Sequence, residues 1–221
     1  MTMPILHSMR TRIKICGLTR IEDVRVCAQL GVDALGFVFY PPSKRFVSAT
    51  HAADLCASLP AFVSTVALFV NPEPKDVNEV IKKMRPSLLQ FHGDEDPSFC
   101  SSFGMPFLKA FRIGAPSLDT AAKVAITCQS FSQAAGWLFD SYTPAYGGSG
   151  QSFDYGLLGG LQDSDFEARP LIVSGGLNAQ NVQLAIQRLT PWAVDVSSGV
   201  EERPGVKCVQ KMQAFVRAVQ L

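Results

Sequence analysis

The sequence carries almost no net charge and contains neither a long apolar run nor a low-complexity tract. With 20 Lys and Arg against 19 Asp and Glu in 221 residues, the charge balance does not favour nucleic acid or an anionic membrane as a partner. No segment approaches the roughly 20 apolar residues that span a bilayer. The start, MTMPILHSMRTR, lacks the order of a secretory signal. We therefore expect a cytoplasmic, soluble enzyme.

Closely spaced cysteines and clustered histidines are also missing. No C-x-x-C pair occurs, and scattered cysteines are typical of reduced thiols rather than of a disulfide framework. The three histidines have no ligand spacing, so we expect no metal. Because an isolated cysteine is most often a small buried hydrophobic residue, a catalytic role has to follow from its position. The six cysteines are Cys16, Cys27, Cys56, Cys100, Cys128 and Cys208.

What the chain does contain is a regular alternation of apolar, β-rich runs with segments of helical period. Several of the apolar runs are nearly continuous in Val, Ile, Leu and Phe, as parallel strands covered on both faces should be. The expected strands are 12–16, 33–39, 63–70, 87–91, 107–112, 136–140, 170–174 and 192–196. The clearest expected helices are 21–30, 49–58, 74–84, 118–128, 179–188 and 206–219. Pro74, Asp96-Pro97 and Asn178 are suitable helix-start residues.

This alternation predicts a single α/β domain, a (β/α)₈ TIM barrel of eight parallel strands. A doubly wound open sheet is the competing fold, but it usually has about five or six strands. We expect residues 12–221 to form the catalytic barrel and residues 1–11 to be a flexible N-terminal extension.

Two strand ends carry groups that can transfer protons. The run KICGLTR places Cys16 where the first strand stops, and the strand AAGWLFD delivers Asp140 to the start of a long loop. In a parallel barrel, both groups would open onto the face that holds the catalytic site. A thiol and a carboxylate there form a candidate proton-transfer pair.

The loops after the seventh and eighth strands are rich in small residues: Gly175 and Gly176 in one, Ser197, Ser198 and Gly199 in the other. Glycine lets backbone N–H groups approach an anion, and helix N-termini favour negative charge. These glycines could merely form tight turns. However, phosphate sites recur at these two loops of the barrel, and we predict a phosphate cradle here.

Two further segments are candidates for substrate contact. The loop 141–152, with Tyr146, Gly147 and Gly148, has a tyrosine to cover substrate and glycines to act as hinges, so it is read as a mobile lid rather than a disordered surface loop. Arg45, on a proline-stiffened loop, is either a solvated charge or a bidentate carboxylate ligand.

Taken in order, seven segments resemble the phosphoribosylanthranilate isomerase family of tryptophan biosynthesis: KICGLTR, GFVFYPPSKRFV, VALFVNP, LQFHGDE, FDSYTPAYGGSG, VSGGLNAQNV and AVDVSSGVE. The resemblance covers nearly the whole expected barrel. It implies an aldose–ketose isomerase without cofactor or metal that acts on a phosphosugar. We expect a monomer or homodimer and, from the charge balance, no nucleic-acid or membrane partner.

The resemblance also implies residue roles in an Amadori rearrangement. Cys16 would be the general base, Asp140 the general acid and Arg45 the ligand of the anthranilate carboxylate, with phosphate held by the two small-residue loops. A thiolate base would require the pKa of Cys16 to fall toward neutrality. Two alternatives are a non-catalytic phosphosugar-binding barrel, which should have lost Cys16 or Asp140, and an enzyme like indole-glycerol-phosphate synthase, in which we expect lysine and glutamate at strand ends.

Overall fold

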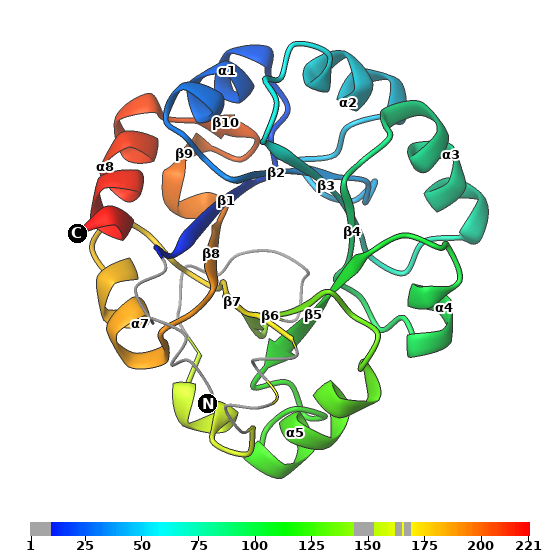
Figure 1. Cartoon of the computed structure of the whole chain (residues 1–221), viewed down its shortest axis with the longest axis vertical. Coiled ribbons are helices and arrows are strands. Elements are labelled where there is room, and N and C mark those ends of the chain that lie inside the picture. Colours follow the sequence, from blue (N-terminus) through cyan, green and yellow to red (C-terminus); the bar gives the residue numbers. More distant parts are fainter. Residues whose placement is uncertain (1–9, 144–152, 162–164, 166–168) are drawn as a thin grey trace, which may run out of the picture.

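Eight parallel strands close into a barrel, viewed end-on in Figure 1. The computed structural model describes residues 10–143, 153–161, 165 and 169–221. Closure comes from β1, which pairs in parallel with both β2 and β8. The strands are β1 Arg12–Cys16, β2 Ala34–Val38, β3 Ser64–Phe69, β4 Leu88–Phe91, β5 Phe107–Ile113, β6 Gly136–Ser141, β7 Leu171–Val173 and β8 Ala193–Val196. The predicted barrel is confirmed, and the open-sheet alternative is excluded.

Helices surround the strands as an outer ring (Figure 1). They are α1 Ile21–Gln29, α2 Ala49–Cys56, α3 Pro74–Met84, α4 Pro97–Ser101, α5 Ala121–Ser130, α7 Val182–Leu189 and α8 Val209–Gln220. Short 3₁₀ helices η1 Tyr155–Leu158 and η2 Ser198–Val200 follow β6 and β8. In the part of the chain that the structure describes, no helix is long and apolar enough to cross a membrane.

Strand alternation separates two layers of side chains. The outward layer packs against the helices and is aromatic, with Phe37, Phe69 and Phe91 fully buried on successive strands. The inward layer is apolar at one end of the barrel, where Leu108, Ala110, Leu138, Ile172 and Ala193 form a separate cluster. The polar side chains of the inward layer lie toward the carboxyl ends of the strands. The barrel interior is therefore polar at that end.

Two predicted helix starts are confirmed. Pro74 is the first residue of α3, and the side chain of Asp96 accepts a hydrogen bond from Phe99 N at the start of α4. The start at 118 is wrong, because α5 begins at Ala121 after the cap Thr120.

The predicted cap at Asn178 is also wrong. Asn178 Oδ1 accepts from Gln180 N in a local turn, and α7 begins only at Val182. A short polar side chain that bonds to the backbone two residues on favours a turn over a helix.

A small antiparallel hairpin was not predicted. It consists of β9 Glu201–Arg203 and β10 Val206–Lys207, and it lies between α8 and α1 in Figure 1. Its turn contains Gly205 with φ +82°, which glycine adopts readily. The final helix consequently starts at Val209 rather than at 206.

Candidate active site

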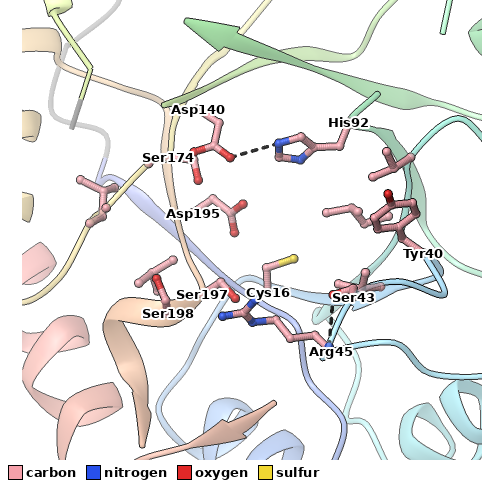
Figure 2. Close-up of a pocket in the computed structure, with 17 residues that line it drawn as sticks. Cys16, Tyr40, Ser43, Arg45, His92, Asp140, Ser174, Asp195, Ser197 and Ser198 are labelled. Carbon is pink, nitrogen blue, oxygen red and sulfur yellow. Dashed lines mark hydrogen bonds and ion pairs between the residues drawn. The ribbon is translucent and has the colours of Figure 1, made fainter. Parts of the chain in front are cut away.

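One pocket lies at the carboxyl ends of the strands and gathers residues from many of them (Figure 2). Of the predicted site residues, it is lined by Cys16, Arg45, Asp140, Gly175, Gly176, Ser197 and Ser198. Gly199 is not among the lining residues, and Tyr146, Gly147 and Gly148 are outside the described residues. The thiol and the carboxylate therefore share one cavity, as the strand-end argument predicts.

Cys16 is the last residue of β1 and is only 5% exposed. Its side chain fits because the neighbouring strand carries Gly36, where an added Cβ would lie 2.6 Å from Cys16 Sγ. Burial raises the pKa of the Cys16 thiol, an effect that the nearby ammonium groups of Lys14 and Lys207 oppose. The net shift of the Cys16 pKa is upward, so the fall in pKa that a thiolate base requires is not present in the free protein.

Lys14 lies two residues before Cys16 and points to the same inner side of the barrel. Its Nζ donates to Oδ1 of Asp195 at 2.9 Å, and both side chains are 5% exposed. Burial alone would lower the pKa of Lys14, but Asp195 and the thiol outweigh this effect and raise it. A permanent ammonium group is thus buried beside the candidate base.

Asp140 lies across the pocket from Arg45 in Figure 2. Its Oδ1 accepts from the backbone N–H of Ser141 at 2.8 Å. Its Oδ2 lies 3.0 Å from Nε2 of His92, which follows β4. Gln90, one inward position earlier on β4, lies 3.1 Å from His92 Nδ1 through its amide nitrogen. These contacts fix the direction in which the carboxyl group faces the cavity.

Arg45 is neither solvated nor isolated. Its Nε and Nη2 donate to the two carboxylate oxygens of Glu201 at 2.8 and 2.7 Å. Glu201 is deeply buried, and although burial alone would raise its pKa, the hydrogen bonds and charges of Arg45 and Lys207 lower it. Glu201 uses one edge of the planar guanidinium group. The Nη1/Nη2 edge stays in position for a second carboxylate.

Lys207 connects the base, the small-residue loop and the arginine. Its fully buried Nζ donates to the carbonyl oxygens of Cys16 at 2.6 Å and Ser197 at 3.2 Å. It also donates to Oε1 of Glu201 at 2.9 Å. The β9–β10 hairpin thus carries an ammonium group into the gap between β1 and β8.

The two small-residue loops pack against each other. A Cβ on Gly199 would lie 1.9 Å from the carbonyl oxygen of Leu177, so only glycine allows this contact. Gly175 and Gly176 have φ +83° and +64°, in the region that glycine favours. Ser197 and Ser198 line the same end of the pocket. Close backbone approach and small side chains make this end suited to an anion.

Another wall of the pocket is apolar. Val38, Leu68 and Val70 form a buried cluster with Cys16, and Tyr40 packs against it. These side chains come from β2, β3 and their ends. The cavity thus combines a surface for a planar ring with polar groups and an anion-binding end, as small-molecule sites commonly do.

Sequence reasoning missed five polar residues of this region. They are Lys14, His92, Asp195, Glu201 and Lys207. For three of them a signal was present: Lys14 and Asp195 occupy inward positions of strands, and His92 directly follows a strand. The contacts of Glu201 and Lys207 depend on the unpredicted hairpin.

Comparison with known proteins places the chain in a family. The family model described as N-(5'-phosphoribosyl)anthranilate (PRA) isomerase matches residues 13–218. The chain belongs to this family. It is therefore an aldose–ketose isomerase of tryptophan biosynthesis.

Curated relatives and solved structures support the same family assignment. The N-(5'-phosphoribosyl)anthranilate isomerase of Bordetella petrii is 57% identical over 211 residues, which cover 96% of each chain. That of Azotobacter vinelandii is 46% identical over 94% of this chain and 97% of the relative. The crystal structure of the Thermotoga maritima enzyme has a TM-score of 0.83 at 36% identity, covering 95% of this chain and 98% of that one.

Proposed function

We propose that the chain catalyses the Amadori rearrangement of N-(5′-phosphoribosyl)anthranilate, with Asp140 as general acid and Cys16 as general base. The observation that carries this proposal is the shared pocket, in which a thiol and a carboxyl group face one cavity. A related isomerase was solved in complex with reduced 1-(o-carboxyphenylamino)-1-deoxyribulose 5-phosphate, at 32% identity and a TM-score of 0.79. A ligand of that kind matches the chemistry of this pocket.

The reaction divides between the two groups. Asp140 gives its proton to the furanose ring oxygen, the C1′–O bond breaks, and a protonated Schiff base forms. The Cys16 thiolate then removes the proton from C2′. The C2′–H electron pair forms the C1′–C2′ double bond while the C=N π pair moves onto nitrogen, which gives a neutral enolamine. Protonation at C1′ and loss of the C2′ hydroxyl proton give the ketone product. General acid–base groups of this kind typically contribute about 10²–10⁴ to the rate.

Substrate binding can be assigned to the remaining walls. The anthranilate carboxylate would accept two hydrogen bonds from the Nη1/Nη2 edge of Arg45, and its ring would pack on Val38 and Leu68. The phosphate would lie against Gly175 and Ser197 at the small-residue loops. Holding both ends of the substrate fixes the reacting carbons between the acid and the base.

The raised thiol pKa gives the order of events a physical reason. In the free protein Cys16 is held as a thiol, because burial disfavours the thiolate. Protonation by Asp140 places a positive charge on the Schiff base beside that thiol. The Cys16 thiol then gives up its proton to water. Because the nearby cation stabilises the resulting thiolate, the base becomes effective after the acid has acted.

The remaining expectations concern the cellular location and the oligomeric state of the chain. We expect the chain to act in the cytoplasm, which is supported by six cysteines that form no disulfide. One related structure is of monomers generated from the dimeric phosphoribosylanthranilate isomerase of Thermotoga maritima. For this chain, monomer or homodimer remains our prediction.

The proposal is tested by steady-state kinetics on freshly prepared phosphoribosylanthranilate. Cys16→Ala and Asp140→Asn should each lower kcat at least about a hundredfold. Cys56→Ala is the matched control, because Cys56 lies on the outer α2 helix and its pKa is raised to about 12; it should keep kcat within about twofold. A near wild-type kcat for Cys16→Ala or Asp140→Asn would refute that residue's assignment.

A further inference from the structure

Gln90 is a buried amide with an unusual hydrogen-bond balance. It lies on the inner side of β4 and is 0% exposed. Its Nε2 is 3.1 Å from His92 Nδ1, whereas its Oε1 has no hydrogen-bond partner among the described residues. Burying an acceptor without a partner costs free energy. An apolar side chain of the same size would avoid that cost, so the amide is poorly explained by stability.

The contact with His92 suggests what the amide does. Nε2 of His92 faces Oδ2 of Asp140 at 3.0 Å (Figure 2). Because two lone pairs would repel at this distance, one of these atoms carries a hydrogen. The proposed acid holds its own proton for the substrate, so we assign this hydrogen to Nε2. A neutral imidazole then has Nδ1 as its acceptor, and an amide N–H that donates to Nδ1 stabilises this tautomer.

The third member of this hydrogen-bonded series, after Gln90 and His92, is the carboxyl group of Asp140. Its Oδ2 receives the Nε2–H of His92, and its Oδ1 receives the backbone N–H of Ser141. Two donors of this kind stabilise the carboxylate that Asp140 becomes when it gives up its proton. They also fix the plane of the carboxyl group, so the proton is presented toward the cavity.

We propose that Gln90 is a positioning residue for the general acid, acting through His92. By donating to Nδ1, it holds His92 in the tautomer with its hydrogen on Nε2, and so keeps a donor aimed at Asp140. The inference rests on the proposed role of Asp140 as the acid. Among near-isosteric side chains only glutamine can donate to Nδ1, because an ionised glutamate and a methionine have no donor.

Two near-isosteric variants separate this role from a structural one. In Gln90→Met, kcat should fall about tenfold with KM within about threefold, while Tm stays equal or rises because an unsatisfied polar group has been removed. In Gln90→Glu, the carboxylate should draw a proton onto Nδ1. The resulting imidazolium still donates from Nε2, but its positive charge favours the ionised form of Asp140 and so leaves the acid without the proton it has to give, which should lower kcat at least as much. A fall in Tm with unchanged kcat in Gln90→Met would overturn the proposal.

The tautomer itself can be read by ¹⁵N NMR of the free protein. With three histidines in the sequence, comparison with His92→Gln assigns the His92 signals. We expect an unprotonated Nδ1 and a protonated Nε2 in the wild type, and a protonated Nδ1 in Gln90→Glu. A protonated Nδ1 in the wild type would refute the inference. Because these spectra need no turnover, they are decided separately from the kinetics of Asp140→Asn, on which the acid assignment depends.

Discussion

The two sides of the pocket hold their catalytic candidates in different ways. On the side of β1 and β8, Cys16 is surrounded by buried charge: the side chains of Lys207 and Glu201 are 0% and 4% exposed. On the side of β4 and β6, the His92 and Asp140 side chains are 15% and 19% exposed. We call the side of Cys16 the base side and the side of Asp140 the acid side. Buried ion pairs lock the base side in place, whereas hydrogen bonds between partly exposed side chains orient the acid side.

This difference follows from the chemistry that each side has to perform. A buried thiol ionises only if positive charge lies nearby, and buried positive charge in turn requires carboxylates such as Asp195 and Glu201. A carboxyl group at the edge of the cavity needs no such support and has to be aimed at one substrate atom. The contrast predicts that substitutions on the base side cost stability as well as rate, while those on the acid side cost mainly rate.

The largest loss of stability is expected for Glu201→Gln. Glu201 accepts from Arg45 Nε and Nη2 and from Lys207 Nζ, so removing its charge leaves two cations without their shared partner. Breaking a buried pair costs about 3–5 kcal/mol. Urea unfolding should show this loss, and KM should rise because Arg45 is no longer held. A loss below about 1 kcal/mol would contradict the locked base side.

A smaller effect, visible in the pH profile, is expected for Lys14→Met. Burial already raises the pKa of Cys16, and Lys14 opposes that rise; removing the ammonium group therefore raises the thiol pKa further. The rising limb of kcat/KM should move to higher pH, and a shift of one pH unit would lower kcat/KM about tenfold below the limb. The pH profiles of kcat/KM for Lys14→Met and the wild type are compared only at pH values where urea unfolding shows that the variant is folded. An unmoved limb would mean that Lys14 does not act on the thiol.

The sequence was sufficient for the barrel and for the catalytic candidates because both are local patterns. Apolar runs marked the strands, and the residue at which a run ends marked Cys16 and Asp140. Parallel closure then brings every strand end to one face. The same logic identified the glycines at 175 and 176, whose positive φ angles require no knowledge of distant partners.

The charge network around the base was not predictable in this way. Lys207 and Cys16 are 191 residues apart in sequence, and the hairpin that joins them interrupts a segment with helical period. The direction of the thiol pKa also could not be read from position, because it is a balance between burial and two ammonium groups. Long-range pairs of this kind leave no periodic signal in the chain.

The smallest effect is expected for Asp94→Asn, which tests the acid side by a matched carboxylate-to-amide change. Arg112 Nη2 donates to Asp94 Oδ1 at 2.9 Å, but the Asp94 side chain is 70% exposed. Exposed ion pairs contribute about 0–1 kcal/mol, since water and salt screen them. Urea unfolding at low and high salt should therefore show a loss below about 1 kcal/mol that shrinks as salt is added. A loss as large as that of Glu201→Gln would mean that both sides of the pocket depend on ion pairs, and the contrast between a locked base and an oriented acid would no longer hold.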